Sequence, residues 1–220
     1  MIITFDCYGT LLDTSSIEQL ISAMAREKSV DSNLAVTLFN SYEDRLMYGQ
    51  TIIPYEKLIK KNLAFMDMEL SSGSFFQDHY TSIINAYYSL KPFPEVLSVL
   101  HQLELAGHKL YLLSNSSKQI MRYNLKMLNN PFLQTFLPEQ THCYKPQLNF
   151  FKYVEQQIDI PSKEHIHIAK GFWWDIVPCT KLNWRKIWIN RNHFNGLKEY
   201  MPYKEFSNLS NIPSYLKDYD

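Results

Sequence analysis

The sequence contains few cysteines: Cys7, Cys143 and Cys179 are the only three among 220 residues, and no two of them show Cys-x-x-Cys spacing. An odd number of cysteines cannot all pair within one chain, and cysteine zinc sites normally use closely spaced pairs. We therefore expect neither a disulfide framework nor a zinc knuckle. Reduced thiols are typical of the cytoplasm, which is the compartment we predict.

The sequence also lacks a net charge, because 22 acidic side chains balance 22 basic ones. Without a broad basic field, neither nucleic acid nor an anionic membrane is an expected partner. No apolar run is long enough to span a bilayer, and the first residues lack the pattern of an export signal. With 45% hydrophobic residues, the chain can bury a substantial core as one domain with an insertion.

The first dozen residues are typical of a buried strand that ends in a carboxylate. An apolar run, Ile2 to Phe5, precedes Asp6, and Gly9 and Thr10 indicate a tight exit loop. Ligands of open α/β sheets bind beyond the carboxyl ends of the strands, so Asp6 would lie at the reactive edge. An aspartate that only caps the following turn is the alternative that these residues leave open.

Helical periodicity follows and continues through four consecutive helices. Such a run does not fit β-α-β alternation, so we interpret about 13–89 as a helical insertion. Alternation resumes at Lys91, and the expected strands are 109–113, 165–169 and 186–189. A proline-broken loop is expected between Leu128 and Thr141, and a tail without recognisable chemistry after the last strand at 186–189. The predicted fold is a doubly wound, mostly parallel α/β sheet formed by 1–12 and 90–220.

Two more segments place polar side chains after strands. Ser114 to Ser117 form a hydroxyl-rich turn that could hold an anion at the next helix start, although a simple N-cap explains it equally. In Tyr-Lys-Pro, Pro146 biases Lys145 toward an extended backbone, so the lysine side chain is aimed. A solvated surface lysine is the alternative.

The histidines do not indicate a metal site. Seven are present, without His-x-x-x-His ligand spacing. His165 and His167 alternate along an expected strand, which favours a half-buried structural role.

Taken in order, these segments resemble the motifs of the haloacid dehalogenase superfamily. Asp6 begins D-x-Y-G-T-L, which is similar to the first motif, and Ser114-Asn115 and Tyr-Lys-Pro at Lys145 are similar to the second and third. The fourth motif, AKGFWWD at 169–175, is a poor match. The resemblance implies a Rossmann-like core with 13–89 as a helical cap domain, and it makes Asp6 the nucleophile.

The other roles also follow from the resemblance. It implies that Lys145 neutralises the anionic substrate beside the nucleophile. The substrate carboxylate would be held by Thr10, Ser114 and Asn115. Asp175 would orient Lys145 or the hydrolytic water, and it could also cap the helix that follows.

Tyr8 favours one branch of the superfamily. A carboxylate nucleophile forms an ester that water then cleaves, and phosphatases of this superfamily use an acid two positions after the nucleophile to protonate the leaving alkoxide. Tyr8 stands at that position, as an aromatic residue does in the L-2-haloacid dehalogenase branch, and a halide leaves without a proton. If Asp6, Lys145, Lys170 and Asp175 converge, their charges sum to zero. No cofactor is therefore expected, and Mg²⁺ would be needed only for a phosphatase.

Several positions depart from that branch. Lys170 and Phe172 stand where it has serine and asparagine, Phe151 replaces a tyrosine, and Arg45 is out of register with the arginine of the cap. Phe172 fits either an apolar wall of the substrate site or the core. These changes suggest a different substrate or lost activity.

The leading hypothesis is a metal-independent hydrolase acting on a small anionic substrate. The first alternative is a phosphatase with an altered general acid. The second is a silent binding protein in which Lys170 is a fixed counter-ion to Asp6. Dimerisation through the aromatic residues of the cap or the tail is left open.

Overall fold

The computed structural model describes residues 1–48, 52–159 and 164–217, and the chain divides into two compact units. The first unit comprises Met1–Asp13, Lys91–Asn115 and Leu125–Asp220, and the second comprises Thr14–Leu90 and Ser116–Asn124. The second unit thus contains most of the insertion expected at 13–89 together with nine residues from a later segment. Its action as a cap stays a prediction.

A six-stranded sheet forms the centre of the first unit, and all of its strand pairs are parallel. The spatial order is β5-β4-β1-β6-β7-β8. The strands are β1 (Ile2–Asp6), β4 (Lys109–Leu113), β5 (Gln134–Phe136), β6 (His165–Ala169), β7 (Lys186–Ile189) and β8 (Lys204–Phe206). Because the chain winds outward from β1 in both directions, the predicted doubly wound α/β fold is confirmed, and Asp6 ends the strand at the switch point where such sheets bind ligands.

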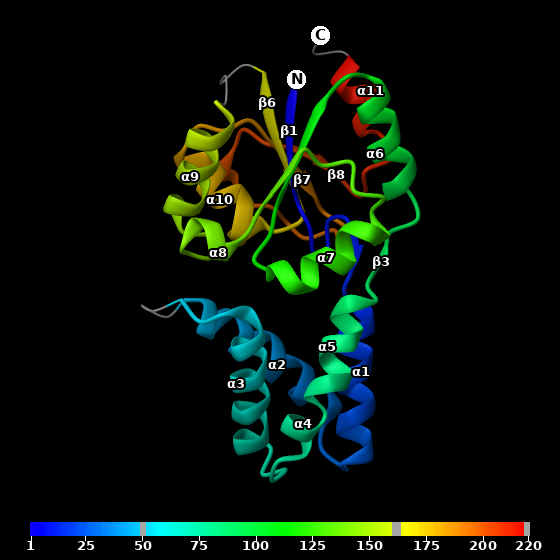
Figure 1. The fold of residues 1–220 in the computed structure, drawn as a ribbon, viewed down its shortest axis with the longest axis vertical. Helices are drawn as coiled ribbons and strands as arrows, with labels where there is room; N and C mark the ends of the chain where they lie inside the picture. The colour runs from blue at the N-terminus through cyan, green and yellow to red at the C-terminus, as the bar shows by residue number, and fades with distance from the viewer. Residues whose placement is uncertain (49–51, 160–163, 218–220) are drawn as a thin grey trace. The chain divides into compact units, whose positions relative to one another are not determined.

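Helices cover both faces of this sheet (Figure 1). On one side lie α8 (Pro138–Thr141), α9 (Leu148–Ile158) and α10 (Val177–Lys181), and on the other lie α6 (Val96–Leu105) and α11 (Ile212–Lys217). Strands buried on both faces are apolar along their whole length rather than alternating. This explains why the apolar runs of β1 and β4 were recognisable in the sequence, whereas β6 (His-Ile-His-Ile-Ala) alternates although all five of its residues are buried.

The remaining elements of the first unit are short connections. Two residues each form β2 (Leu12–Asp13) and β3 (Lys91–Pro92), which pair antiparallel. The π-helical turn η1 (Phe172–Ile176) follows β6, and the 3₁₀ turn η2 (Lys198–Tyr200) precedes β8. Helix α7 (Lys118–Met127) contributes residues to both units.

Two expectations about this unit were wrong. The loop expected between Leu128 and Thr141 contains β5 and most of α8, and β7 is not the last strand, because the tail after it supplies η2, β8 and α11. Both strands are only three residues long, so neither shows a recognisable period. β8 pairs only with β7, and its Lys-Glu-Phe sequence has the charged character of a sheet edge.

The second unit is helical. It contains α1 (Ser15–Glu27), α2 (Ser32–Met47), α3 (Tyr55–Glu69), α4 (Phe75–Asp78) and α5 (Tyr80–Tyr88). The segment from Phe75 to Tyr88 is divided at His79 into the two helices α4 and α5. The Asp67 carboxylate accepts hydrogen bonds from the backbone N–H groups of Phe76 and Gln77, which stabilises the start of α4 as a separate turn.

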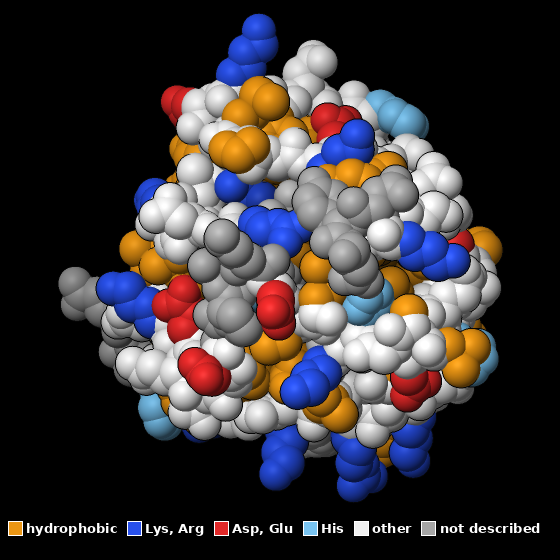
Figure 2. Space-filling model, turned by 90° about the horizontal axis from the view of Figure 1, so that it is seen from above, with side chains coloured by type: hydrophobic (Ala, Val, Ile, Leu, Met, Phe, Trp, Pro, Cys, Tyr) orange, Lys and Arg blue, Asp and Glu red, His pale blue; other side chains and the backbone are white. Residues whose placement is uncertain are grey.

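Charged side chains of both signs are interspersed on the face shown in Figure 2. This mixture agrees with the balanced composition of the chain. Within the described residues, no helix has both the length and the apolar character needed to cross a membrane.

One hydrophobic cluster lies between the sheet and the helices α9 and α10. Its fully buried members include Phe136, Phe150 and Phe151, and Trp184 packs edge-on against Phe151 with ring centroids 5.5 Å apart. Cys143 and Cys179 belong to the same cluster as free thiols. The cysteines therefore act as small apolar side chains.

Phe150→Ala should lower the free energy of unfolding by about 3–5 kcal/mol, because it leaves a cavity in this cluster. Leu105→Ala, at a side chain that is 74% exposed, is the control and should change it by less than about 1 kcal/mol. Urea denaturation of both variants measures the difference. Equal losses would contradict the assignment of Phe150 to the core.

A buried polar chain joins β1 to β6. The Thr4 hydroxyl lies 2.8 Å from His165 Nε2 and 2.8 Å from His167 Nδ1. Both histidines are at most 1% exposed, so the expectation of half-buried side chains was wrong. The reason is that aromatic side chains cover this face of β6: Trp184 packs edge-on against both rings, and Phe151 packs against His167.

Burial, with added repulsion from His167 and Arg185, lowers the pKa of His165 to about 3. The unfolded chain therefore binds a proton at this histidine between about pH 6.5 and 3 while the folded chain does not, so stability falls as the pH falls through this window.

The free energy of unfolding should drop by about 2 kcal/mol more in the parent than in His165→Gln when the pH changes from 7 to 5. Denaturation at the two pH values measures this, with the exposed His101→Gln as the control. A parent and a His165→Gln variant with the same pH dependence would show that His165 is protonated in the folded protein.

Candidate active site

The loop after β1 turns Thr10 back onto Asp6. The amides of Leu11 and Leu12 both donate to the Cys7 carbonyl, and Gly9 has a φ of 73°, a conformation that glycine adopts without strain. The Thr10 hydroxyl then donates to Asp6 Oδ2 at 2.6 Å. The tight loop expected from Gly9 and Thr10 thus fixes the orientation of the Asp6 carboxylate.

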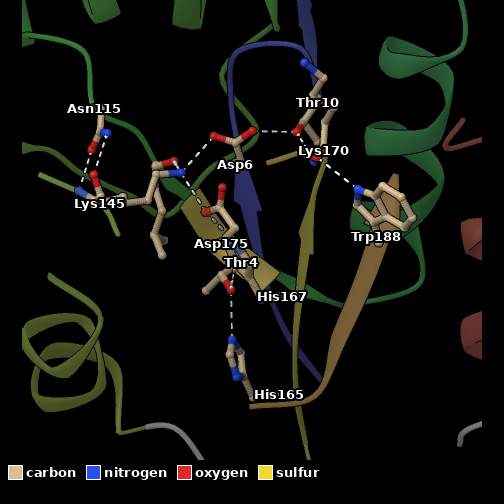
Figure 3. A network of polar contacts seen from close by, with 11 residues as sticks. Thr4, Asp6, Thr10, Asn115, Lys145, His165, His167, Lys170, Asp175 and Trp188 are labelled. Atoms are coloured by element: carbon tan, nitrogen blue, oxygen red, sulfur yellow. Dashed lines mark hydrogen bonds and ion pairs between the residues drawn. The ribbon is translucent and has the colours of Figure 1, made fainter. Parts of the chain in front are cut away.

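Lys145 lies between two carboxylates (Figure 3). Its ammonium donates to Asp6 Oδ1 at 2.8 Å, to Asp175 Oδ1 at 2.7 Å and to the Leu113 carbonyl at 3.3 Å. These three bonds use all three N–H groups, and the side chain is only 2% exposed. Lys145 is therefore a buried and fully bonded cation.

The Lys145 backbone is clamped by Asn115. The Lys145 amide donates to Asn115 Oδ1 at 2.7 Å, and Asn115 Nδ2 donates to the Lys145 carbonyl at 3.1 Å. A side-chain amide bonded at both ends holds the backbone in one conformation, so the lysine is aimed by Asn115 as well as by the neighbouring proline.

Asp175 comes from η1, directly after β6. Its Oδ1 accepts from Lys145 and, at 3.0 Å, from His167 Nε2. Its Oδ2 is buried and has no hydrogen-bond partner among the described residues. A Cβ on Gly171 would lie 2.5 Å from Oδ2, so glycine is required there. Asp175 caps no helix, because the cap position of η1 is Gly171 and that of α10 is Ile176.

The three charges control one another. Burial raises the pKa of Asp6, which the Lys145 ammonium opposes and the Asp175 carboxylate reinforces. Burial also acts against the charge of Asp175, but Lys145 and His167 outweigh it and hold the pKa of Asp175 below its usual range. Burial alone would lower the pKa of Lys145, and the two carboxylates more than reverse this. These shifts favour the ionised form of both side chains, so Asp175 is an anion and Lys145 is a cation.

Lys170 reaches this centre through its backbone. Its amide donates to Thr10 Oγ1 at 2.7 Å, and Trp188 Nε1 donates to its carbonyl at 3.1 Å. The side chain is exposed and packs against Gly9, where an added Cβ would lie 3.1 Å from Lys170 Cδ. In the described part of the chain, Lys170 makes no ion pair with Asp6. Its charge is therefore not part of the buried centre.

The other residues predicted for the site lie in different surroundings. Ser114 is buried at the end of β4, and its amide donates to the Phe136 carbonyl. Tyr8 is half-buried in the loop after Asp6. The ring of Phe172 packs edge-on in an aromatic cluster completed by Trp188, Tyr200 and Tyr203.

Sequence reasoning missed two residues of this region. His167, expected to be only structural, donates to Asp175. Arg191 follows β7 and donates to the carbonyls of Gly9 and Thr10 at 3.1 and 2.8 Å, while it pairs with Glu95 at 2.7 Å. Its position just after a parallel strand was the available signal, because such positions meet at one edge of the sheet.

The donor set does not suit a divalent metal. Asp6 and Asp175 share one ammonium, and the exposed Lys170 adds a second positive charge at this edge of the sheet. Among the described residues, no group of three or more His, Cys, Asp or Glu side chains could hold a metal ion.

Lys145→Met should lower the free energy of unfolding at pH 7 by about 3–5 kcal/mol, because it leaves two buried carboxylates without their shared cation. Adding Asp6→Asn to this variant should recover part of the lost stability, since Asp175 is then the only buried carboxylate of the triad that is still charged. Chemical denaturation of the parent, the single variant and the double variant measures both effects. A single variant as stable as the parent would contradict a charged buried triad.

Comparison with known proteins agrees with this geometry. A family model described as haloacid dehalogenase-like hydrolase matches residues 1–177. An (S)-2-haloacid dehalogenase of Pseudomonas putida is 26% identical over 97% of this chain and 95% of its own, and (S)-2-haloacid dehalogenase 1 of Pseudomonas sp. strain CBS-3 is 23% identical over 96% and 94%. A crystal structure of an L-2-haloacid dehalogenase superposes with a TM-score of 0.85 at 18% identity, covering 98% of both chains. The chain therefore belongs to the haloacid dehalogenase-like hydrolases.

Proposed function

We propose that this hydrolase cleaves the carbon–halogen bond of a small 2-haloacid, with Asp6 as the nucleophile. The observation that carries the proposal is the Lys145 ammonium shared by Asp6 and Asp175 at 2.8 and 2.7 Å. A buried carboxylate with a fixed cation on one oxygen and a fixed hydroxyl on the other is oriented for attack on carbon.

In the first step, an Asp6 oxygen attacks C2 of the haloacid. A C–O bond forms, the C–halogen bond breaks, and the halide leaves with the electron pair. No proton is needed, which agrees with Tyr8 in place of a general acid. Lys145 offsets the negative charges that meet at the site, and Thr10 holds Asp6, since its one hydroxyl proton is already donated to that carboxylate.

In the second step, water cleaves the ester at the Asp6 carbonyl carbon. Asp175 Oδ2, the buried oxygen without a partner among the described residues, is the acceptor for the water proton. As the acyl C–O bond breaks, the proton passes from Asp175 to the departing alkoxide, which gives a 2-hydroxy acid. The second proton of the water leaves the new Asp6 carboxyl group for solvent, which regenerates the Asp6 carboxylate. The lowered pKa of Asp175 keeps it deprotonated but makes it a weak base, so its role rests on position, with the other oxygen anchored by Lys145 and His167.

The substrate class is supported by three observations. The curated relatives carry the name (S)-2-haloacid dehalogenase. Ser114 and Asn115 lie at the end of β4, next to β1, where the substrate carboxylate would bind. The exposed ammonium of Lys170 adds a positive charge at the same edge of the sheet. Because the ring of Phe172 packs within the aromatic cluster of Trp188, Tyr200 and Tyr203, we propose that Phe172 supports this edge of the sheet by packing.

Chloride release from L-2-chloropropionate, measured without added metal, should be catalysed by the parent protein. It should be abolished in Asp6→Asn and unchanged in Asp78→Asn, which alters an exposed aspartate bonded to Ser74. In the parent, mass spectrometry of rapidly quenched reactions should find an ester on the peptide that contains Asp6. Undiminished release in Asp6→Asn would overturn the proposal.

The same assay separates the alternatives. Release of inorganic phosphate from phosphate monoesters that depends on Mg²⁺ would indicate a phosphatase with an altered acid. Turnover of neither substrate class would favour a silent binding protein, although the fixed Lys170–Asp6 ion pair which that alternative requires is not formed among the described residues.

A further inference from the structure

Behind the proposed catalytic centre, four buried polar side chains form a continuous line (Figure 3). They run from His165 through Thr4 and His167 to Asp175, and each is at most 1% exposed. Thr4 on β1 lies directly opposite His167 on β6 in the parallel register. The line is therefore built into the central strand pair of the sheet.

The hydrogen-bond chemistry of the line fixes one of its hydrogens and limits where the others can lie. Asp175 Oδ1 is an acceptor, so His167 Nε2 must carry the proton of their 3.0 Å bond. A neutral His167 then presents Nδ1 as an acceptor. The Thr4 hydroxyl has one proton, so it donates to His167 Nδ1 and accepts from His165 Nε2, at 2.8 Å each.

The far end of the line favours the same direction. His165 is held neutral by burial, by the neighbouring His167 and by Arg185, which together lower its pKa to about 3. Its ring packs edge-on against Trp184, with centroids 4.5 Å apart. A neutral His165 carries one ring proton, and with that proton on Nε2 all the donors of the line point toward Asp175.

We propose that Thr4, His165 and His167 form a positioning relay that holds Asp175 Oδ1 on Lys145 and leaves Oδ2 free for the hydrolytic water. The relay rests on the function proposed above, and it acts on the second step, the cleavage of the ester. None of its three residues touches Asp6 or the substrate, so they are positioning residues. Without the His167 bond, the Asp175 carboxylate is free to rotate and Oδ2 loses its fixed direction.

The relay predicts the ring tautomers, which ¹⁵N NMR of labelled full-length protein measures without any substrate. At pH 7, both His165 and His167 should be neutral and protonated at Nε2 only. His165→Gln and His167→Gln assign the two signals. Protonation of either ring at Nδ1, alone or in addition, would overturn the direction of the relay.

Kinetics test the effect on catalysis. His167→Leu should lower kcat by about 10- to 100-fold, the loss typical when an orienting partner of a functional group is removed, and lower KM in the same proportion. The ratio kcat/KM should stay within about 2-fold, because it reports only the steps up to halide release. The variant should release a burst of about one chloride per protein and accumulate the Asp6 ester, because only the second step is slowed. His167→Gln places an amide donor near the position of Nε2 and should restore most of the rate.

Each outcome of these kinetic measurements supports or overturns the proposed relay. A His167→Leu variant that turns over like the parent, or that changes KM alone, overturns the relay. If His167→Leu does not fold, Thr4→Val and His167→Gln are compared instead. Thr4→Val removes the hydroxyl that holds the His167 ring and should slow the second step, whereas His167→Gln keeps a donor for Asp175 and should retain most of the rate. A parent that releases no halide contradicts the proposed function, and the tautomers measured by NMR then decide the relay by themselves.

Discussion

The rest of the structure depends on the Lys145 ammonium bonded between two buried carboxylates. Burying an ion costs several kcal/mol, and that cost is offset only when geometry and hydrogen bonding are complete. Here the lysine has three acceptors for three N–H groups, and Asp6 has a donor on each oxygen. This requires the end of β1, the turn after β6 and the segment before α9 to meet within hydrogen-bonding distance. The parallel sheet provides that meeting, because its strands end at the same edge.

Several contacts outside the charged triad keep it rigid. Arg191 braces the loop after Asp6 through two backbone carbonyls, and Asn115 clamps the backbone of Lys145. Gly171 leaves the room that Asp175 Oδ2 occupies. The residues that bear the charges therefore come from motifs recognisable in the sequence, while the residues that orient them are spread over strands far apart in the chain.

The departures from the dehalogenase pattern fall into two kinds. Phe151 lies in the core against Trp184, and Phe172 lies in an aromatic cluster with residues of the C-terminal segment, so both replacements are absorbed by packing. Lys170 instead presents an exposed positive charge beside the loop of Asp6. The first kind changes how the fold is supported, and the second changes the charge that an anionic substrate meets.

By itself, the sequence determined the central strands and the residues at their ends. Runs such as Ile2–Phe5 are apolar because interior parallel strands are buried on both faces, and Asp6 and Lys145 were recognisable from the turn residues beside them. Only the tertiary structure decided the roles of His167 and Arg191, the exposure of Lys170 and the existence of β8. These depend on which strands become neighbours, and the residues that meet come from strands that do not touch one another along the chain. A three-residue edge strand, or a histidine that serves a carboxylate on another element, leaves no local period in the sequence.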